Sequence, residues 1–284
     1  MTKIAFIALA CLACLLALGD NAFAWGAGVH LVTGNFILDH LSLLAPAVAE
    51  VLRGRRNDFL YGCLSADIFI GKGSKVTPDH CHNWSTGQKL LRASEPRLRA
   101  YAWGYLAHLA ADVVAHNYYV PNMLGGLPGA GRLSHVWAEM QADAKVGCCW
   151  RQARAVFDLG RGEQDRYLRA TLAQTKLSFG IKKRLFRGGL SLCGLKPWHD
   201  SVRFLDRRLP ALSCAADDAY LASMLELTLA VTLDFLKDPE GSPATAFDPI
   251  GSQRLALAQR LRREETGLLF PIDQPLADLL ASAA

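Results

Sequence analysis

Apolar residues recur at helical spacing along most of the chain. Hardly any stretch shows the sustained two-residue alternation that is typical of a half-buried strand. The pattern therefore predicts an all-α fold, built as a single multi-helix globular domain. The predicted helices cover 31–53 with a break near Pro46, 86–93, 97–119, 133–146, 163–177, 199–208, 217–237 and 251–263.

The predicted helix 97–119 differs from the others because it is apolar nearly all round. It ends before Pro121, and beyond its first turn it is uncharged up to His108. Such a helix is expected to lie buried at the centre of the molecule. It nevertheless contains the ionisable residues His108, Asp112 and His116. Buried ionisable groups need partners, and a metal ion would supply one.

The composition is that of a compact, soluble, globular protein. Of the 284 residues, 51% are hydrophobic and 20% are charged, which argues against a disordered or fibrous chain. The formal net charge of +5 suits a phosphate-bearing substrate or an anionic membrane. No basic tail of the kind that binds nucleic acid is visible.

The first 24 residues have the features of a secretory signal peptide. Lys3 precedes an apolar run from Ile4 to Gly19, and the small-x-small triplet Ala22-Phe23-Ala24 follows. An anchoring helix is the alternative, but the run is short for a bilayer. No later window has the roughly 20 uncharged residues that a membrane span requires. We therefore expect a secreted or periplasmic protein, residues 25–284, with no transmembrane segment after signal removal.

Six cysteines remain after the signal peptide, an even number that permits disulfides in an exported protein. Their spacing lacks the Cys-x-x-Cys pairs of a zinc ribbon. The pairing stays open for Cys63, Cys81, Cys148, Cys149, Cys193 and Cys214.

Two His-x-x-x-Asp/Glu pairs occur on predicted helices, where residues four apart share a face. The first pair is His108 with Asp112, and the second is His135 with Glu139. Zinc favours nitrogen and carboxylate ligands, and such pairs on adjacent helices can converge on it. A single pair is a weak signal, since a lone buried histidine is more often a hydrogen-bonded core residue.

With Asp67 and His82 added, these motifs resemble the zinc-dependent phospholipase C family, whose trinuclear zinc site is shared with related single-strand nucleases. Members of the family are secreted and begin, once processed, with a tryptophan whose amino group and carbonyl oxygen bind one zinc. Cleavage after Ala24 would expose Trp25, followed by Gly26-Ala27-Gly28-Val29-His30. Cleavage is then chemically necessary, because an acylated Trp25 nitrogen is a very poor ligand. The resemblance runs from Trp25 to about Ala144.

The resemblance implies two to three Zn²⁺ ions. In it, Trp25 and His30 hold one ion, Asp112 bridges it to a second ion held by Asp67, His82 and His108, and a third ion lies on His116, His135 and Glu139. Three residues, instead of the family's usual five, separate Asp112 from His116. Either ring of the His80-Cys81-His82 segment could be the ligand. His82 is preferred because His82-Asn83-Trp84 resembles the family's His-x-aromatic pattern.

The resemblance further implies an exported zinc-dependent hydrolase of phosphoric diesters. The preferred function is a phospholipase C that hydrolyses the glycerol-side phosphodiester of phospholipids at a membrane surface by means of a zinc-bound hydroxide. Asp67 is the candidate for orienting or deprotonating the attacking water. The segment from Lys176 to Trp198 mixes basic and apolar residues and could lie on a membrane. An ordinary solvated helix with an apolar underside explains it equally well.

Two alternatives stay open. A single-strand-specific nuclease could use the same trinuclear site, but it would need aromatic stacking platforms and a basic groove, which the sequence does not display clearly. Nucleic acid is therefore not a partner in the preferred interpretation. The second alternative is a non-catalytic exported protein stabilised by zinc. Structural zinc sites are normally closed four-ligand cages rich in cysteine, whereas this set is rich in histidine and carboxylate. The oligomeric state is not indicated.

Overall fold

The structure is a computed structural model. It describes residues 25–68, 80–124, 132–146, 150–172, 178–193, 200, 202–204, 218–261 and 270–283. Within these ranges every regular element is a helix, which confirms the predicted all-α class. The predicted signal peptide lies outside the described residues.

The first half of the chain forms a long central helix, α6, and the helices that pack around it. They are α2 (Ala27–Asp39), η1 (Leu41–Leu43), α3 (Pro46–Leu52), α4 (Arg56–Ser65), η2 (Ala66–Ile68), α5 (Trp84–Leu91), α6 (Pro96–Val114), the π-helix η3 (Ala115–Tyr119), α7 (Val120–Leu124) and α8 (Arg132–Lys145). The second half supplies α9 (Trp150–Asp158), α10 (Gly162–Thr171), α11 (Phe179–Cys193), α13 (Asp218–Lys237), η4 (Pro243–Ala246), α14 (Ser252–Arg260) and α15 (Gln274–Ala283).

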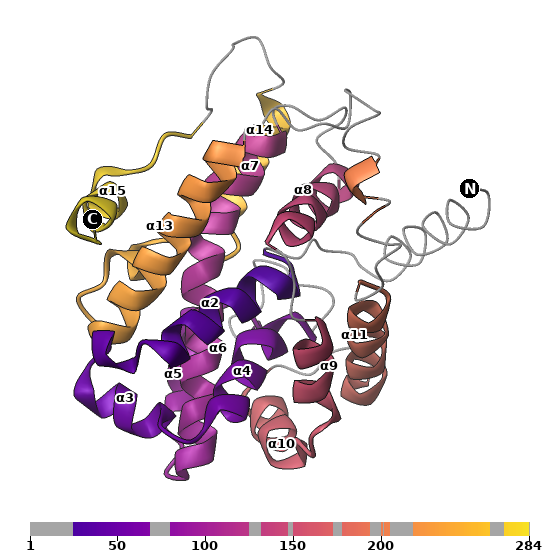
Figure 1. Ribbon diagram of the computed structural model, residues 1–284, viewed down its shortest axis with the longest axis vertical. Coiled ribbons are helices and arrows are strands. Elements are labelled where there is room, and N and C mark those ends of the chain that lie inside the picture. Colours follow the sequence, from indigo (N-terminus) through magenta and orange to yellow (C-terminus); the bar gives the residue numbers. More distant parts are fainter. Residues whose placement is uncertain are drawn as a thin grey trace.

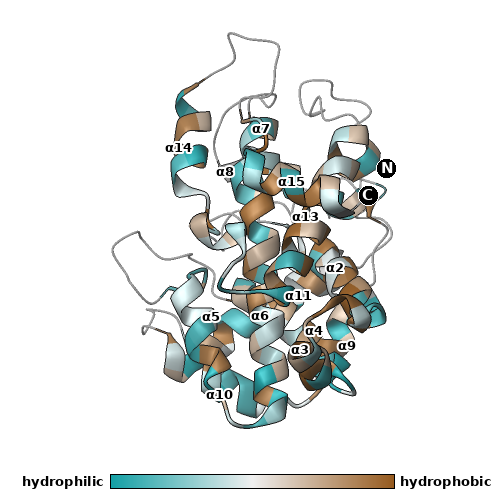
Figure 2. Ribbon diagram, turned by 90° about the vertical axis from the view of Figure 1, so that its left-hand side faces the viewer, coloured by the Kyte–Doolittle hydropathy of each residue, from teal (hydrophilic) through white to brown (hydrophobic). Residues whose placement is uncertain are grey.

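The central element is α6. In Figure 1 it runs vertically through the molecule, with α7 continuing it at the top and α13 beside it. Every residue of α6 from Ala100 to Val114 is buried, as the uncharged pattern of this helix predicts. Figure 2 shows prominent hydrophilic stretches on outer helices such as α10 and α14. The side chains of His108 and Asp112 on α6 therefore lie in the interior of the protein.

Two apolar cores meet along α6. One core includes α6 residues from Ala100 to Ala110 together with side chains of α3, α4, α9 and α11. The other begins at Ala111 and continues through η3 and α7 to α8, α13, α14 and α15. His108 and Asp112 flank this junction, so the polar groups of α6 lie where one core ends and the next begins.

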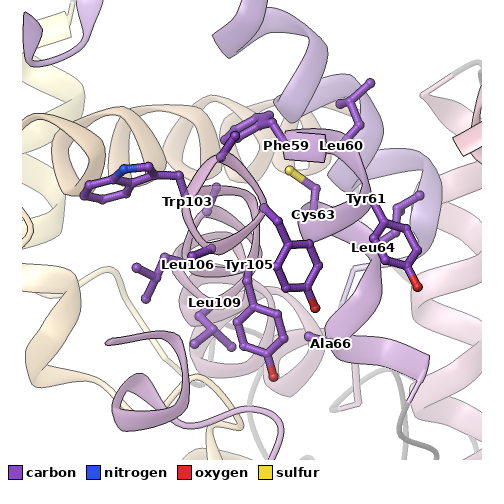
Figure 3. Close-up of a cluster of buried hydrophobic side chains, with 14 of the residues drawn as sticks. Phe59, Leu60, Tyr61, Cys63, Leu64, Ala66, Trp103, Tyr105, Leu106 and Leu109 are labelled. Carbon is purple, nitrogen blue, oxygen red and sulfur yellow. The ribbon is translucent and has the colours of Figure 1, made fainter. Parts of the chain in front are cut away.

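The helices α4 and α6 pack with their backbones in close approach. Figure 3 shows their apolar side chains, such as Phe59 and Tyr105, gathered in one cluster. A Cβ atom on Gly62 would lie 2.1 Å from the carbonyl oxygen of Tyr101, and a Cβ atom on Gly104 would lie 1.9 Å from that of Phe59. Both positions therefore require glycine. This packing brings η2, which follows α4, beside the middle of α6.

Replacing Gly104 with Ala is expected to lower the free energy of unfolding by about 1–3 kcal/mol or more, because the added methyl group collides with backbone that cannot move aside. Urea unfolding measures the change. Gly188→Ala on α11 is the matched control, since a Cβ atom there meets nothing within 4 Å. Alanine at that helical position should be neutral or slightly stabilising. Equal effects of the two substitutions would contradict the close-approach argument.

Most predicted helices are confirmed, but α4, α9 and α15 were not predicted. The helix α11 was predicted only as one interpretation of the segment from Lys176 to Trp198. In α4 every residue from Asp58 to Ser65 is buried, so the helix has no polar face and no helical period for the sequence to display. Residues 173–177 and most of 199–208, parts of two predicted helices, lie outside the described residues.

The predicted helix 97–119 is confirmed as an α-helix to Val114, but its last five residues form a π-helix, and helical structure does not end before Pro121. The helix α7 continues past Pro121 to Leu124. Proline removes one backbone donor, which leaves the carbonyl four residues earlier without its usual partner. That carbonyl belongs to Asn117, and it accepts a hydrogen bond from Arg254 Nη1 at 3.2 Å. A contact from a distant part of the chain thus allows helical structure to pass through the proline.

Candidate metal centre

Four buried side chains from three segments meet beside the middle of α6. Asp67 comes from η2, and His82 lies just before α5. His108 and Asp112 lie one helical turn apart on α6. Their exposed fractions are between 0% and 3%, so bulk water does not screen their charges.

The donor atoms of these four side chains lie close together. His82 Nε2 is 3.2 Å from Asp67 Oδ1, 3.3 Å from Asp112 Oδ2 and 3.1 Å from His108 Nε2. His108 Nε2 is 3.8 Å from Asp67 Oδ1 and 3.2 Å from Asp112 Oδ2. These are five of the six edges that join four points.

The five distances are those expected between neighbouring ligands of one zinc ion. Four ligand atoms about 2.0–2.2 Å from a central ion lie about 3.3–3.6 Å from one another. The five separations between ligand atoms, 3.1 to 3.8 Å, extend slightly beyond both ends of that range. Two imidazole nitrogens and two carboxylate oxygens are also ligands that zinc accepts. The four side chains could therefore hold a zinc ion.

A second group shares Asp112 with the first. His30 of α2 places its Nε2 atom 3.3 Å from Asp112 Oδ1, the oxygen that does not face His82 and His108. The His30 ring stacks on the His108 ring with centroids 3.9 Å apart. His30, His108 and Asp112 together form a second set of ligand atoms that could hold a metal ion. The carboxylate of Asp112 therefore presents one oxygen to His30 and the other to His82 and His108.

The environment of His30 favours its neutral form. Burial lowers the pKa of His30 below the ordinary value of 6.5, and the neighbouring His108 lowers it further, while Asp112 opposes the shift. The neutral imidazole is the form that binds a metal ion. The site therefore keeps His30 ready for coordination near neutral pH.

Trp25 lies two residues before the start of α2. Its side chain is fully buried, and the indole stacks on Tyr119 of the π-helix with centroids 4.6 Å apart. The carbonyl of Gly26 accepts a hydrogen bond from the backbone N–H of His30 at 3.4 Å. Trp25 and His30 are therefore held in one short, buried arm of the chain.

Two contacts connect the residues of the third predicted group, although their ligand atoms do not form a three-residue cluster like the two described above. His135 Nε2 of α8 is 2.9 Å from Glu139 Oε1, one helical turn away. The ring of His116, from η3, meets the ring of His135 edge to face with centroids 5.3 Å apart. All three residues are buried. The π-helix has wider turns than an α-helix, so His116 points in a different direction from the one a regular helix would give it.

The second half of the chain supports the π-helix that contains His116. The side-chain amide of Asn117 donates to the carbonyls of Val113 and Asp248, both at 2.9 Å. Arg254 forms an ion pair with Asp273, which also accepts from the Tyr118 hydroxyl. The sequence assigned no role to residues after about 145, and these contacts show one.

Hydrogen bonds behind the histidines orient their rings. His108 Nδ1 lies 2.9 Å from the carbonyl oxygen of Cys63, and His82 Nδ1 lies 3.0 Å from Cys81 Sγ. His80, the alternative ligand, accepts from the backbone N–H of His82 at 3.2 Å through its own Nδ1. His82, rather than His80, therefore faces the cluster. Such contacts fix which ring nitrogen faces a metal and raise its basicity.

The basic and apolar segment after Lys176 packs inward in its described part. On α11, Phe186 and Leu190 are buried in the core beside α9, whereas Ile181 and Arg184 face outward. An ordinary helix with an apolar underside describes α11, because Phe186 and Leu190 are buried in the core and not available to a membrane.

One helix in the described part of the chain, α13, is long and apolar enough to cross a membrane by length and composition. A buried core helix meets the same criteria. The side of α13 that includes Leu227 and Val231 is buried in the second core, against α6 and α15.

Residues 29–181, more than half of the chain, match the family model of zinc dependent phospholipase C. The chain belongs to this family. The match confirms the predicted family and extends it beyond Ala144, through α9 and α10. Comparisons with curated proteins and with solved structures found no match.

Membership in the zinc-dependent phospholipase C family identifies a hydrolase of the phosphodiesterase type at the level of the family. The matched range includes every predicted zinc ligand except Trp25, which precedes it. The buried histidine and aspartate groups could bind the metal on which the family depends.

Proposed function

We propose that this protein is an exported phosphodiesterase that hydrolyses phospholipids on the glycerol side of the phosphate and uses two or three zinc ions. The observation that supports the proposal most directly is the convergence of buried donor atoms from Asp67, His82, His108 and Asp112, in which His82 Nε2 lies 3.1–3.3 Å from an atom of each of the other three. Family membership supplies the reaction class.

In this proposal the zinc ligands fall into three sets. The first set is Asp67, His82, His108 and one oxygen of Asp112. The second is the other oxygen of Asp112 with His30 and the amino-terminal nitrogen and carbonyl of Trp25. The third is His116, His135 and Glu139.

Clustered zinc ions, when bound, would neutralise the oxygens of a phosphodiester and lower the pKa of a coordinated water to about 7. Asp67 accepts or directs the proton of the attacking water, since a buried carboxylate next to the reacting centre can act as a general base. The burial of the cluster excludes bulk water, which strengthens each electrostatic contact with the phosphate. No side-chain nucleophile is required.

The scarcity of exposed aromatic rings among the described residues favours a lipid over a single-stranded nucleic acid as substrate. Single-strand binding uses exposed aromatic rings on which bases stack. In the described part of the chain, Phe204 is the aromatic residue with an exposed ring, whereas Trp25 and Tyr119, which stack on each other, are buried. The substrate class therefore follows the family.

Zinc counting on the mature protein, followed by two substrate assays, tests the proposal. Plasma emission spectrometry should find two to three zinc ions per chain. The loaded protein should release phosphorylated head groups and diacylglycerol from mixed phospholipid vesicles and should leave single-stranded DNA intact. Cleavage of the DNA alone would identify a nuclease. Bound zinc without either activity would identify a structural role for the metal.

An extension of the mature amino terminus tests the role of Trp25. Two extra residues before Trp25 convert its amine to an amide, so we expect one zinc ion fewer per chain and a fall in kcat/KM of roughly 100-fold. The same two residues added after Ala284 serve as the control. A protein that keeps its full zinc content with a blocked Trp25 would contradict the amine ligand.

A further inference from the structure

The helix α8 has three acidic or imidazole side chains on one face. His135 and Glu139 belong to the third proposed zinc site, and Asp143 follows after another four residues. Residues four apart share a face of a helix, so Asp143 lies on the same face, one turn farther along. No role has been given to this third residue.

Asp143 binds the first turn of α2. Its Oδ2 atom accepts from the backbone N–H of Gly28 at 3.2 Å, and its Oδ1 atom accepts from that of Val29 at 3.1 Å. The first amides of a helix have no partner within the helix, and Gly26 at the N-cap has no side chain to supply one. A carboxylate 115 residues away in the sequence therefore caps α2.

The contact extends to the residue after Trp25. A Cβ atom on Gly26 would lie 2.1 Å from Asp143 Oδ2 and 2.6 Å from Oδ1. The carboxylate thus lies directly against the backbone between Trp25 and α2, where only glycine leaves room. Asp143 is buried, with an exposed fraction of 7%, so its position is well defined by its surroundings.

We infer that Asp143 is a positioning residue for the amino-terminal arm and holds Trp25 and His30 in place beside Asp112. The inference rests on the proposed function, since it assigns Asp143 to the second zinc site of that proposal. Trp25 precedes the capped turn and His30 follows it, so one carboxylate restrains both ends of the arm. Because α8 also contains His135 and Glu139, this contact links the third zinc site with the second.

Asp143→Asn tests the inference. The amide keeps the size of the side chain but can accept at one position instead of two. We expect the mature, zinc-loaded variant to contain about one zinc ion fewer per chain. Its affinity for the lost ion should fall by roughly 10–100-fold, the usual effect of removing a group that orients a metal ligand. The rise in melting temperature that zinc produces should shrink accordingly.

Asp58→Asn is the matched control. Asp58 is buried to the same extent, at 7%, and accepts from Arg161 Nη1 at 2.7 Å and from Gln164 Nε2 at 2.8 Å, away from the cluster. Its loss should lower the melting temperature with and without zinc, while zinc content and the zinc-induced rise stay as in the unchanged protein. A merely structural role for Asp143 would give this same pattern.

Gly26→Ala provides a second test from the opposite side of the contact. It keeps the carboxylate and displaces the arm, so it should reproduce the loss of one zinc ion. Full zinc content in both Asp143→Asn and Gly26→Ala, with the melting temperature of the chelated proteins recorded to verify folding, would overturn the inference. That result would leave the proposed function intact, which fails instead if the unchanged protein binds no zinc.

Discussion

Replacing Asp112 with Asn is expected to lower kcat/KM by roughly 10³-fold or more, the loss that follows when several kcal/mol of metal-ion stabilisation is removed. The expectation follows from the placement of the two carboxylate oxygens. Oδ1 faces His30 at 3.3 Å, and Oδ2 faces His82 and His108 at 3.3 and 3.2 Å. In the amide, one of these two oxygens is replaced by an N–H₂ group, which cannot bind a metal ion together with the histidine nitrogens that it faces. Both ions of the first two sets should therefore be lost or greatly weakened.

Zinc content and phospholipid hydrolysis measured on the same preparation check this expectation. Asp234→Asn is a suitable control. Asp234 lies on α13, accepts a hydrogen bond from the Ser242 hydroxyl at 2.7 Å and belongs to none of the proposed metal-ligand sets. It should keep its zinc and its activity. An Asp112→Asn protein with two to three zinc ions and normal turnover would show that Asp112 does not bridge.

Replacing Asp67 with Asn is expected to lower kcat by about 10²–10⁴-fold while the protein stays folded, because general-base catalysis contributes rate factors of that order. The amide oxygen can still face His82 and His108, which lie 3.2 and 3.8 Å from Asp67 Oδ1. The amide cannot accept a proton. Zinc supplied in excess should therefore restore metal binding to the variant but not its activity.

Circular dichroism, zinc content and kcat at saturating zinc separate the two roles of Asp67. Retained activity in Asp67→Asn would dismiss the proton-accepting role. Activity that returns in step with added zinc would show that Asp67 acts as a ligand alone. The Asp112→Asn protein offers the comparison, because its defect should lie in metal content.

Local patterns in the sequence were sufficient for the helical pairs of the site. The four-residue spacing of His108 with Asp112, and of His135 with Glu139, placed each pair on one face, and the structure finds donor atoms 3.2 and 2.9 Å apart. These separations depend on helix geometry within a single turn, so they required no knowledge of the rest of the fold. The burial of α6 was also predicted from a short window of sequence, because this helix is uncharged from its second turn to His108.

The π-helix and its supports could not be predicted in this way. The sequence around His116 fits a regular helix, and the change at Val114 depends on contacts with Asp248 and Arg254, far along the chain. Asp143 was missed because its partners are backbone amides of α2, which no side-chain pattern reveals. The spacing His135, Glu139 and Asp143 was the available signal, since it continues the ligand face of α8 by one turn.

The sequence by itself determined the helical class, the family, the buried central helix and the pairs of ligands one turn apart, because each depends on backbone periodicity or on residue types within a short window. The tertiary structure alone decided which pairs meet. Close packing of α4 on α6 brings Asp67 to His108, and the segment before α5 turns His82, the ring that the sequence preferred over His80, toward them. Contacts between segments far apart in the sequence depend on how whole helices pack, and that packing is a property of the folded chain as a whole.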